Sequence, residues 1–400
     1  MNRRSFVLKG SAGAIASLVS LSSFSNISFS KNDIVNIGVI GTGNRGSGLI
    51  PLIDKIPNLR LSGCCDILPF RLKSGLNEAE NKVIGYSDYR KLLDDSDIDA
   101  VIIATPFSTH SSIAIDALDA GKHVYGEKTL AKGYEEIKAL YKRTCQSSKI
   151  FQTGHQYHSS RLYTHVVDLI KKGKIGNITA FECQWNRYGD WRREVPSEEL
   201  ERLVNWRMYK EYSGGLVAEL CSHQIDFVNW VLEASPNQVM GTGGIDYWKD
   251  GRETYDNIHL IYSYPNGVEA KFTCLTSNAY NNYQIKVMGD KGTIILDFQR
   301  AWFYPLENND LKEFGNVDGV SGATVQWEEG KGIPITIPHT EPSEQALVDF
   351  AENILNNRNP SSDIVTGSKT AIAVQMGLDT LNSGKVVKWN KDFDKYSSSN

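Results

Sequence analysis

The chain has 400 residues, of which 40% are hydrophobic and 22% are charged, and its formal net charge at pH 7 is -4. This length and composition are typical of a globular protein with two or three domains and a large buried core. Acidic and basic residues are mixed along the chain, so there is no basic stripe of the kind that binds a phosphate backbone. We therefore expect no nucleic-acid partner.

The first 32 residues are expected to be an export signal that takes no part in the fold. The paired arginines Arg3 and Arg4 precede an apolar run of small residues from Ser11 to about Phe24. This pattern is typical of a twin-arginine signal, and the run is too short to span a membrane. The alternative is an uncleaved signal anchor. We expect a periplasmic or otherwise exported protein with no stable membrane insertion after signal cleavage.

Residues 33–153 alternate short apolar runs with helical stretches. The strand candidates are residues 35–40, 59–65, 100–105, 123–126 and 150–153, and the helix candidates are residues 111–120 and 134–145. This alternation predicts an α/β domain with a doubly wound parallel sheet, that is, a Rossmann domain.

Residues 154–390 have a different pattern, which predicts a C-terminal α+β domain with a large, mostly antiparallel open sheet. Its strand candidates are residues 178–185, 258–264, 268–273, 283–288 and 293–297, and its helix candidates are residues 160–172, 341–356 and 364–383. Turns such as Pro265-Asn266-Gly267 join neighbouring strands, as in antiparallel sheets. We expect this domain to bind substrate and to mediate oligomerisation, and residues 391–400 to form a tail.

A glycine-rich loop follows the first predicted strand directly. It contains Gly41, Gly43 and Gly46, and Asp66 stands at the end of the second predicted strand. In this context the glycines allow a pyrophosphate to approach the backbone, and the carboxylate can accept a hydrogen bond from a ribose hydroxyl. We predict NAD as the cofactor, because Asp66 would repel the additional phosphate of NADP. Arg71, five residues further on, could contact that phosphate, so NADP stays an alternative.

Further motifs follow the glycine loop in order. They are Cys65-Asp66, Ala104-Thr105-Pro106 with His110, Gly126-Glu127-Lys128, and Gly214-Gly215 ahead of Glu219, His223 and Asp226. Together these motifs resemble those of the Gfo/Idh/MocA family, which includes glucose-fructose oxidoreductase and inositol dehydrogenase, over residues 34 to 390.

The resemblance implies a lysine beside the nicotinamide, Lys128, and an acid/base group at the substrate carbinol, supplied by the segment from Glu219 to His223. The chain departs from the family pattern twice, because Thr129 replaces a proline and Glu219 replaces an aspartate. The residues expected to bind the cofactor are Gly41, Gly43, Asn44, Arg45, Gly46, Asp66, Thr105, Pro106, His110, Glu127 and Lys128. For His110, packing is the alternative role.

The same residues suit the chemistry of hydride removal from a carbon that bears a hydroxyl group. A histidine can take the hydroxyl proton, and a nearby ammonium can stabilise the developing alkoxide. The expected catalytic residues are Lys128, His223, Glu219 and Asp226. The last three share one face of a predicted helix, where a carboxylate could hold the imidazole tautomer. The alternative is a solvated or capping cluster.

An aromatic and arginine-rich tract in the second domain is expected to contact a sugar, because aromatic faces suit its C–H surfaces and polar groups suit its hydroxyls. The expected substrate-binding residues are Tyr157, His158, Arg187, Trp191 and Trp206. The alternative is a loop at an oligomer interface. His155 and His158 lack a third ligand at suitable spacing, so we expect no metal site.

These features predict a NAD-dependent oxidoreductase that acts on a hydroxyl of a sugar, glycoside or polyol. An exported enzyme meets no cytoplasmic cofactor pool, so we expect tightly bound NAD that is recycled in place. One alternative is a NAD-dependent glycoside hydrolase similar to family 109. That family has a Tyr-Pro-Thr-His-Gly motif around its catalytic histidine, where this chain has Leu220-Cys221-Ser222-His223-Gln224. A non-catalytic NAD-binding sensor or scaffold is another alternative. We expect a homodimer or homotetramer, because an open sheet face often pairs with a copy of itself.

Overall fold

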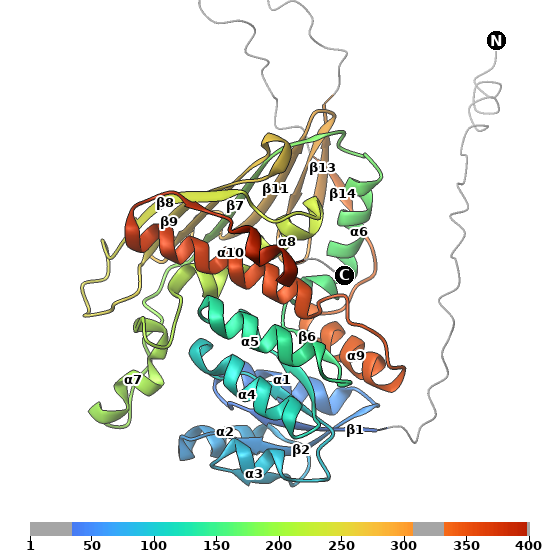
Figure 1. The fold of residues 1–400 in the computed structure, drawn as a ribbon, viewed down its shortest axis with the longest axis vertical. Coiled ribbons are helices and arrows are strands. Elements are labelled where there is room, and N and C mark those ends of the chain that lie inside the picture. The colour runs from blue at the N-terminus through green and yellow to red at the C-terminus, as the bar shows by residue number, and fades with distance from the viewer. Residues whose placement is uncertain (1–33, 307–331, 398–400) are drawn as a thin grey trace, which may run out of the picture. The chain divides into compact units, whose positions relative to one another are not determined.

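The computed structural model describes residues 34–306 and 332–397 (Figure 1). The expected export signal, residues 1–32, lies outside these ranges. Within them, no helix combines the length and the apolar character needed to cross a bilayer.

The first sheet is parallel and has the strand order β3-β2-β1-β4-β5-β6. Its strands are β1 (Val35–Ile40), β2 (Leu59–Cys65), β3 (Ile84–Tyr86), β4 (Ala100–Ile103), β5 (His123–Gly126) and β6 (Phe151–Thr153). The accompanying helices are α1 (Asn44–Lys55), α2 (Pro69–Glu78), α3 (Tyr89–Leu93), α4 (His110–Asp119) and α5 (Tyr134–Cys145). The predicted doubly wound sheet is confirmed. The order of the strands reverses between β1 and β4, where such sheets form a ligand crevice.

Helices cover both faces of this sheet, which explains its continuous apolar strands. On one face α1 buries Leu49, Ile50 and Ile53 completely, because residues spaced by three or four positions share one side of a helix. Helix α9 (Pro342–Leu355) also packs on this core, although it follows the second sheet in the chain. Its Phe350 contacts Tyr125 edge to face, with ring centroids 5.7 Å apart.

The second sheet has nine strands among the described residues, in the order β14-β13-β12-β11-β7-β10-β9-β8-β15. They are β7 (Ile178–Asn186), β8 (Gln238–Gly244), β9 (Asn257–Ser263), β10 (Glu269–Leu275), β11 (Tyr283–Gly289), β12 (Gly292–Leu296), β13 (Ala301–Pro305), β14 (Ile333–Ile335) and β15 (Val387–Lys388). Every neighbouring pair is antiparallel except β7 and β10. The predicted mostly antiparallel sheet is therefore confirmed.

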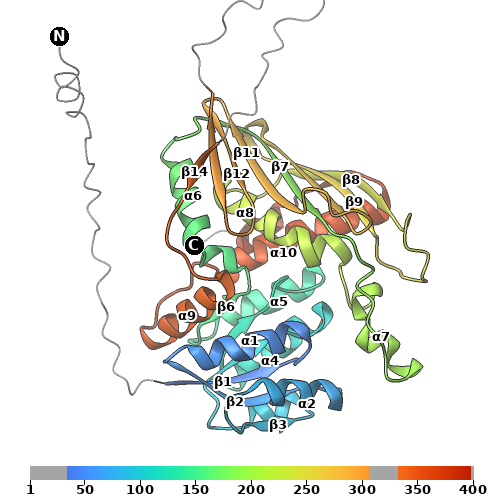
Figure 2. The ribbon, with the colours of Figure 1, turned by 180° about the vertical axis from the view of Figure 1, so that it is seen from behind.

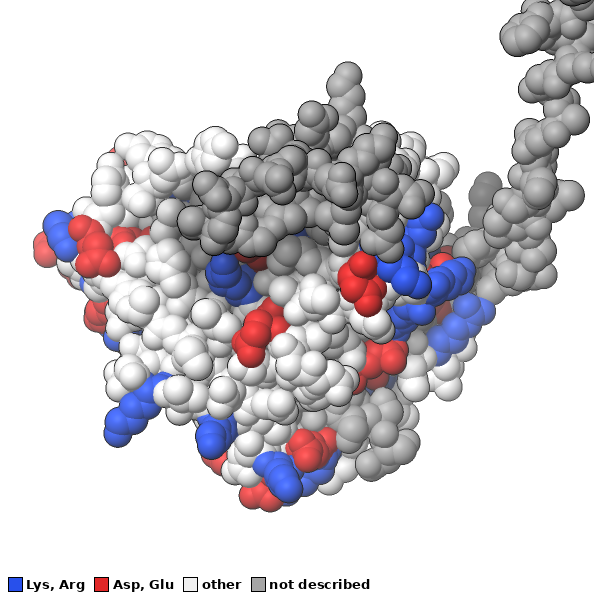
Figure 3. Space-filling model, turned by 90° about the horizontal axis from the view of Figure 1, so that it is seen from above, with Lys and Arg blue, Asp and Glu red and all other residues white. Residues whose placement is uncertain are grey.

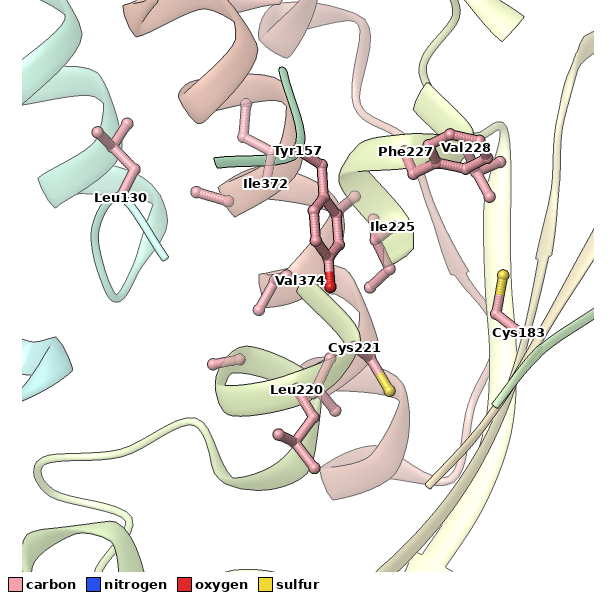
Figure 4. Packing of buried hydrophobic residues seen from close by; sticks show 14 of the residues in the cluster. Leu130, Tyr157, Cys183, Leu220, Cys221, Ile225, Phe227, Val228, Ile372 and Val374 are labelled. Atoms are coloured by element: carbon pink, nitrogen blue, oxygen red, sulfur yellow. The ribbon is translucent and has the colours of Figure 1, made fainter. Parts of the chain in front are cut away.

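Helices cover one face of the second sheet. They are α6 (Arg161–Lys171), α8 (Ser222–Leu232) and α10 (Ile364–Ser383). Helix α10 lies between this sheet and α5 of the first domain, as the two opposite views in Figures 1 and 2 show. The apolar residues at this junction belong to one cluster, and Figure 4 shows Tyr157, Ile225, Ile372 and Val374 in it.

Two segments differ from the sequence-based expectation. Residues expected to lie on one regular helix are divided between a π-helical turn, η5 (Val217–Cys221), and α8. Part of the expected tail forms η7 (Lys391–Tyr396), in which Phe393 stacks on Tyr134 at 4.8 Å. These aromatic contacts hold the C-terminal residues against α5.

Charged side chains of both signs are interspersed over the described part of the face in Figure 3. The mixture agrees with the even distribution of charge along the sequence.

Candidate active site

The glycine loop after β1 forms a close turn against the backbone of β4. Gly41 has a φ of 90°, and a Cβ at this position would lie 2.8 Å from the backbone of Ala104. A Cβ at Gly46 would lie 1.9 Å from the carbonyl oxygen of Gly41. The sequence therefore needs glycine at both positions, because a side chain would push the turn away from the sheet.

Helix α1 begins directly after this turn. Its N-cap residue is Gly43, and no side chain caps the first turn. Backbone N–H groups at a helix N-terminus favour an anion such as a pyrophosphate. A Cβ at Gly43 would have only Arg71 within 4 Å. The space over the turn is therefore open toward a cationic side chain.

A cavity of about 260 Å³ extends from this turn and is lined by both domains. The first domain contributes the glycine loop, Asp66, Arg71 and the Thr105-Pro106 segment, and the second contributes residues between Trp191 and Tyr212. Arg71 donates a hydrogen bond to the carbonyl oxygen of Val204 at 3.1 Å. The glycine turn, the uncapped helix N-terminus and the adjoining cavity together suit a dinucleotide.

The Asp66 carboxylate lies at the predicted end of β2 but is largely engaged by the protein. It accepts hydrogen bonds from the backbone N–H groups of Thr42 and Leu68, each at 2.9 Å. Burial raises the pKa of Asp66, and these hydrogen bonds and the charge of Arg71 oppose that effect. Asp66 thus fixes the shape of the glycine loop.

A second cavity of about 480 Å³ adjoins the first, and Lys128, Glu219 and His223 all line it. Lys128 follows β5, and its Nζ donates to the carbonyl oxygen of Glu219 at 2.7 Å. Burial lowers the pKa of Lys128, and the charge of Glu219 opposes this effect. Thr129, which replaces the family's proline, donates to the carbonyl oxygen of Ala218 at 3.1 Å. The π-helical turn thus supplies both acceptors.

Glu219 is paired with a cation and not with His223. Its Oε2 accepts a hydrogen bond from Nε of Arg207 at 2.8 Å. Burial alone would raise the pKa of Glu219, but the charges of Arg207 and Lys128 lower it. Glu219 is therefore a fixed negative charge between two cations.

His223 lies on the first turn of α8 and is 6% exposed. Its Nδ1 is enclosed and has no hydrogen-bond partner among the described residues, which leaves Nε2 as the ring nitrogen that can meet the cavity. The pKa of His223 is well below its usual value because of burial and the nearby charges of Lys128 and His155. The imidazole is thus neutral at physiological pH and able to accept a proton.

Asp226 and His158 point away from the cavity and bind each other. Their hydrogen bond measures 2.9 Å, and Asp226 also accepts one from Thr370 at 3.0 Å. His158 stacks on Trp230 with a centroid distance of 4.1 Å. The expectation that Asp226 lies beside His223 to orient it, and that His158 faces the substrate, differs from this geometry. The π-helical turn separates Glu219 from His223, whereas Asp226 shares α8 with His223 and is held by tertiary contacts with His158 and Thr370.

The expected cofactor residues Arg45, Glu127 and His110 form a frame around the glycine loop and Lys128. Nε of Arg45 contacts the Glu127 carboxylate at 2.7 Å. The two ring nitrogens of His110 lie 2.8 Å from the carbonyl oxygen of Thr129 and 2.9 Å from that of Thr105. These contacts join the end of β4 to the loop that carries Lys128. Asn44, Arg45, Thr105, His110 and Glu127 also line the second cavity.

The expected substrate residues Arg187, Trp191 and Trp206 line this cavity too. The Arg187 guanidinium lies 5.6 Å from the centre of the Trp191 ring. Trp191 has a φ of 64°, an unusual conformation for a bulky residue that often accompanies a functional site. Tyr157 is buried and lies beside His223, with ring centroids 5.2 Å apart.

Sequence reasoning missed Arg207, Trp185 and Gln156 as residues of the site. Arg207 and Trp185 belonged to the aromatic and arginine-rich tract, but their spacing did not indicate which members face the cavity. Gln156 neighbours Tyr157, and no pattern distinguished it. No group of three or more histidine, cysteine, aspartate or glutamate residues in the described ranges could hold a metal ion.

Two family models match the chain. The model described as the oxidoreductase family, NAD-binding Rossmann fold, matches residues 35–155, and the GFO/IDH/MocA C-terminal domain matches residues 163–295. These matches cover the whole first sheet and strands β7 to β11 of the second, and they end within β12. The chain therefore carries a NAD-binding Rossmann domain followed by a GFO/IDH/MocA C-terminal domain.

Individual proteins give the same assignment. Levoglucosan dehydrogenase from Pseudarthrobacter phenanthrenivorans is 30% identical over 238 residues, which are 54% of this chain and 59% of that protein. Glycosyl hydrolase family 109 protein 2 from Shewanella sp. (strain ANA-3) is 28% identical over 197 residues, which are 46% of this chain and 42% of that protein. The solved structure of levoglucosan dehydrogenase with NADH and L-sorbose has a TM-score of 0.72 at 20% identity and covers 89% of this chain and 99% of its own. This last likeness shows the fold.

The glycine turn gives a matched pair of substitutions. We expect Gly46→Ala to lower dinucleotide affinity at least about tenfold and to lower the melting temperature, because its Cβ would overlap the Gly41 carbonyl oxygen. Gly48→Ala on the same helix meets nothing within 4 Å and should preserve both. Fluorescence titration with NADH and thermal unfolding measure the two effects. Equal affinity for both variants would contradict a dinucleotide site at this turn.

Proposed function

We propose that this chain, which belongs to the Gfo/Idh/MocA oxidoreductase family, uses NAD to oxidise a hydroxyl group of a sugar, glycoside or polyol. The observation that carries the proposal is the meeting of a buried, neutral His223 with the amine of Lys128 in one cavity beside the dinucleotide cradle. A sensor or scaffold has no need of this pair.

The bound nicotinamide supplies the acceptor for the hydride, and the chain supplies the proton chemistry. As the carbinol C–H bond breaks, Nε2 of His223 takes the hydroxyl proton and the carbonyl forms. The Lys128 ammonium stabilises the negative charge that develops on the substrate oxygen. Glu219 and Arg207 hold their charges next to Lys128, so that the ammonium keeps its position during turnover.

Two features support NAD as the cofactor in preference to NADP. The Asp66 carboxylate is anchored at the end of β2 by two backbone N–H groups. A fixed negative charge at that position disfavours an additional phosphate on the ribose. The Arg71 guanidinium donates a hydrogen bond to the Val204 carbonyl oxygen, and this bond restrains it.

We also propose that the cofactor stays bound through many turnovers in an exported enzyme. The second domain lines the cofactor cavity with residues between Trp191 and Tyr212, and Arg71 bonds to that segment. Helix α7 (Glu201–Val204) belongs to the same segment, and Figure 1 shows it extending from the second domain alongside the first. Recycling in place then requires a second sugar or another electron-accepting partner. A homodimer or homotetramer formed through the open face of the second sheet completes the proposal.

A second candidate is a glycoside hydrolase that uses the same oxidation as a first step. The similarity to the family 109 protein favours it. Transient oxidation of a ring hydroxyl acidifies the neighbouring C–H bond, and elimination then expels the aglycone. Water adds across the double bond that elimination leaves, and reduction of the ketone by the NADH formed in the first step restores NAD. The residues around His223 differ from that family's motif, so we place hydrolysis second.

The decisive experiment uses protein purified without added cofactor and a panel of sugars and aryl glycosides. We expect stoichiometric nicotinamide reduction without aglycone release, followed by turnover once a second sugar is added. His223→Ala and Lys128→Ala should each lower kcat at least about 10²-fold and leave NAD bound. Repeated aglycone release would establish the hydrolase instead. Unchanged turnover in both variants would refute the site.

The pH dependence of oxidation follows from the two shifted groups. The pKa of His223 lies well below 6.5, so its base form persists through neutral pH and is lost only on further acidification. Burial lowers the pKa of Lys128 from 10.5, so the ammonium is lost earlier on the alkaline side. We expect kcat/KM for a neutral sugar to fall on the acid side at a pH below 6.5. On the alkaline side we expect it to fall at a pH below 10.5. Lys128→Arg should move the alkaline limit upward, and an acid limit at or above 6.5 would contradict the assignment.

The cofactor preference can be tested at Asp66. We expect Asp66→Asn to lower the affinity ratio of NADH to NADPH at least about tenfold, or about 1.4 kcal/mol, because the fixed charge is removed. Asp66→Glu retains the charge and serves as the control. Fluorescence titration of protein stripped of cofactor measures both affinities. An unchanged ratio in Asp66→Asn would show that another residue selects the cofactor.

A further inference from the structure

We propose that the substrate is a neutral glycoside and that a groove next to the catalytic cavity binds its aglycone or second sugar ring. This inference rests on the proposed oxidation and adds to it the size and chemical class of the substrate.

The groove has a volume of about 980 Å³ and lies at the ends of β11, β12 and β13. Its walls come from the loop after β10, the loop between β12 and β13, and the start of α9. Gln156 and Trp185 line both this groove and the catalytic cavity. The two spaces therefore adjoin at these two side chains.

An aromatic wall leads from the catalytic base into the groove. The Trp185 ring lies 5.8 Å from that of His223 and 4.8 Å from that of Tyr283. Phe298 stacks on Tyr283 at 4.2 Å and meets Trp185 edge to face at 5.4 Å. A ligand oxidised beside His223 can extend along this wall without a break in apolar contact.

The outer part of the groove has the side chains that bind sugar rings. The Arg300 guanidinium lies 5.1 Å from the centre of the Trp302 ring. The amide side chains that line the groove are Asn281, Asn282, Gln284 and Gln299. Aromatic faces contact C–H surfaces, and amides both donate to and accept from hydroxyls. An indole among several amides thus favours a polar ring over a purely apolar one.

The charges among the described lining residues of the groove disfavour an anionic occupant. Arg300 contacts Asp297 at 2.6 Å. The carboxylate of Glu341 accepts a hydrogen bond from the N–H of Glu344 as the N-cap of α9. The described lining thus has one cation, Arg300, against two carboxylates, which favours a neutral ligand over a phosphate or carboxylate.

The junction between the two spaces has an acceptor that the protein leaves unused. Oε1 of Gln156 has no hydrogen-bond partner among the described residues, and a buried acceptor without a partner is costly. A rotation of the terminal amide would turn Oε1 toward a ligand hydroxyl, which would donate the missing hydrogen bond. Gln156 would thus recognise, through a hydrogen bond, a ligand ring that extends from the catalytic cavity into the groove.

Size supports the same occupant. The catalytic cavity of about 480 Å³ must accommodate the nicotinamide end of the cofactor as well as the reacting ring. Cavities of roughly 300–1,000 Å³ are typical for whole small-molecule ligands. The adjoining groove of about 980 Å³ offers the additional space that a second ring needs.

The experiment compares a free sugar with its matched aryl glycoside and disaccharide, using the full chain with its bound cofactor. We expect kcat/KM for the glycosides to exceed that for the free sugar at least about tenfold. Trp302→Ala should remove most of this advantage by raising KM for the glycosides, with kcat/KM for the free sugar unchanged. Gln299→Ala, at an exposed position of the hairpin loop, tests the groove if Trp302→Ala does not fold.

Tyr304→Ala is the matched control. Tyr304 lies two residues further along β13, on the same side of the strand as Trp302, and it does not line the groove. It should leave the preference intact. Equal kcat/KM for free sugar and glycosides, or a preference that survives both groove variants, would overturn the inference while the oxidoreductase proposal stands. Absence of hydride transfer from every compound would overturn the proposed function itself.

Discussion

The active site depends on one constraint, which is that a buried ammonium must be surrounded by acceptors and negative charge. The π-helical turn η5 meets it, because its carbonyl groups face Lys128 and Thr129. The same turn presents Glu219, whose charge lies between Lys128 and Arg207. His223 is the second residue of α8, which begins at Ser222 directly after this turn. A rare backbone turn thus brings the amine of Lys128, its counter-charge and the His223 imidazole together, and π-bulges often occur at functional sites.

The Rossmann half could be predicted from the sequence because local patterns specify it. Its buried strands are continuous apolar runs, and α5 (Tyr134–Cys145) has the bounds that its pattern predicts. Strand β8 could not be predicted in this way, since three glycines among its seven residues weaken the strand signal. The packing of α9 on the first sheet could not be predicted either, because the apolar face of a helix does not indicate which of two sheets it packs against.

The site residues show the same division. The glycine loop, Lys128 and His223 occupy the places that their motifs predict, and they line the two adjoining cavities. The partners of Asp226 could not be predicted, because helical spacing places it near His223 while the fold turns it toward His158 and Thr370. Arg207 and Glu219 lie twelve residues apart in sequence, and only tertiary structure brings that pair together.

Helix α9 has a consequence for biosynthesis. Phe350 and its neighbours complete the apolar core beneath β1 and β5, yet the ribosome makes them after nearly all of the second sheet. The first domain is synthesised early, but its apolar core lacks these side chains until α9 has been made. A chain truncated before α9 would therefore leave an apolar face of the first sheet exposed to solvent.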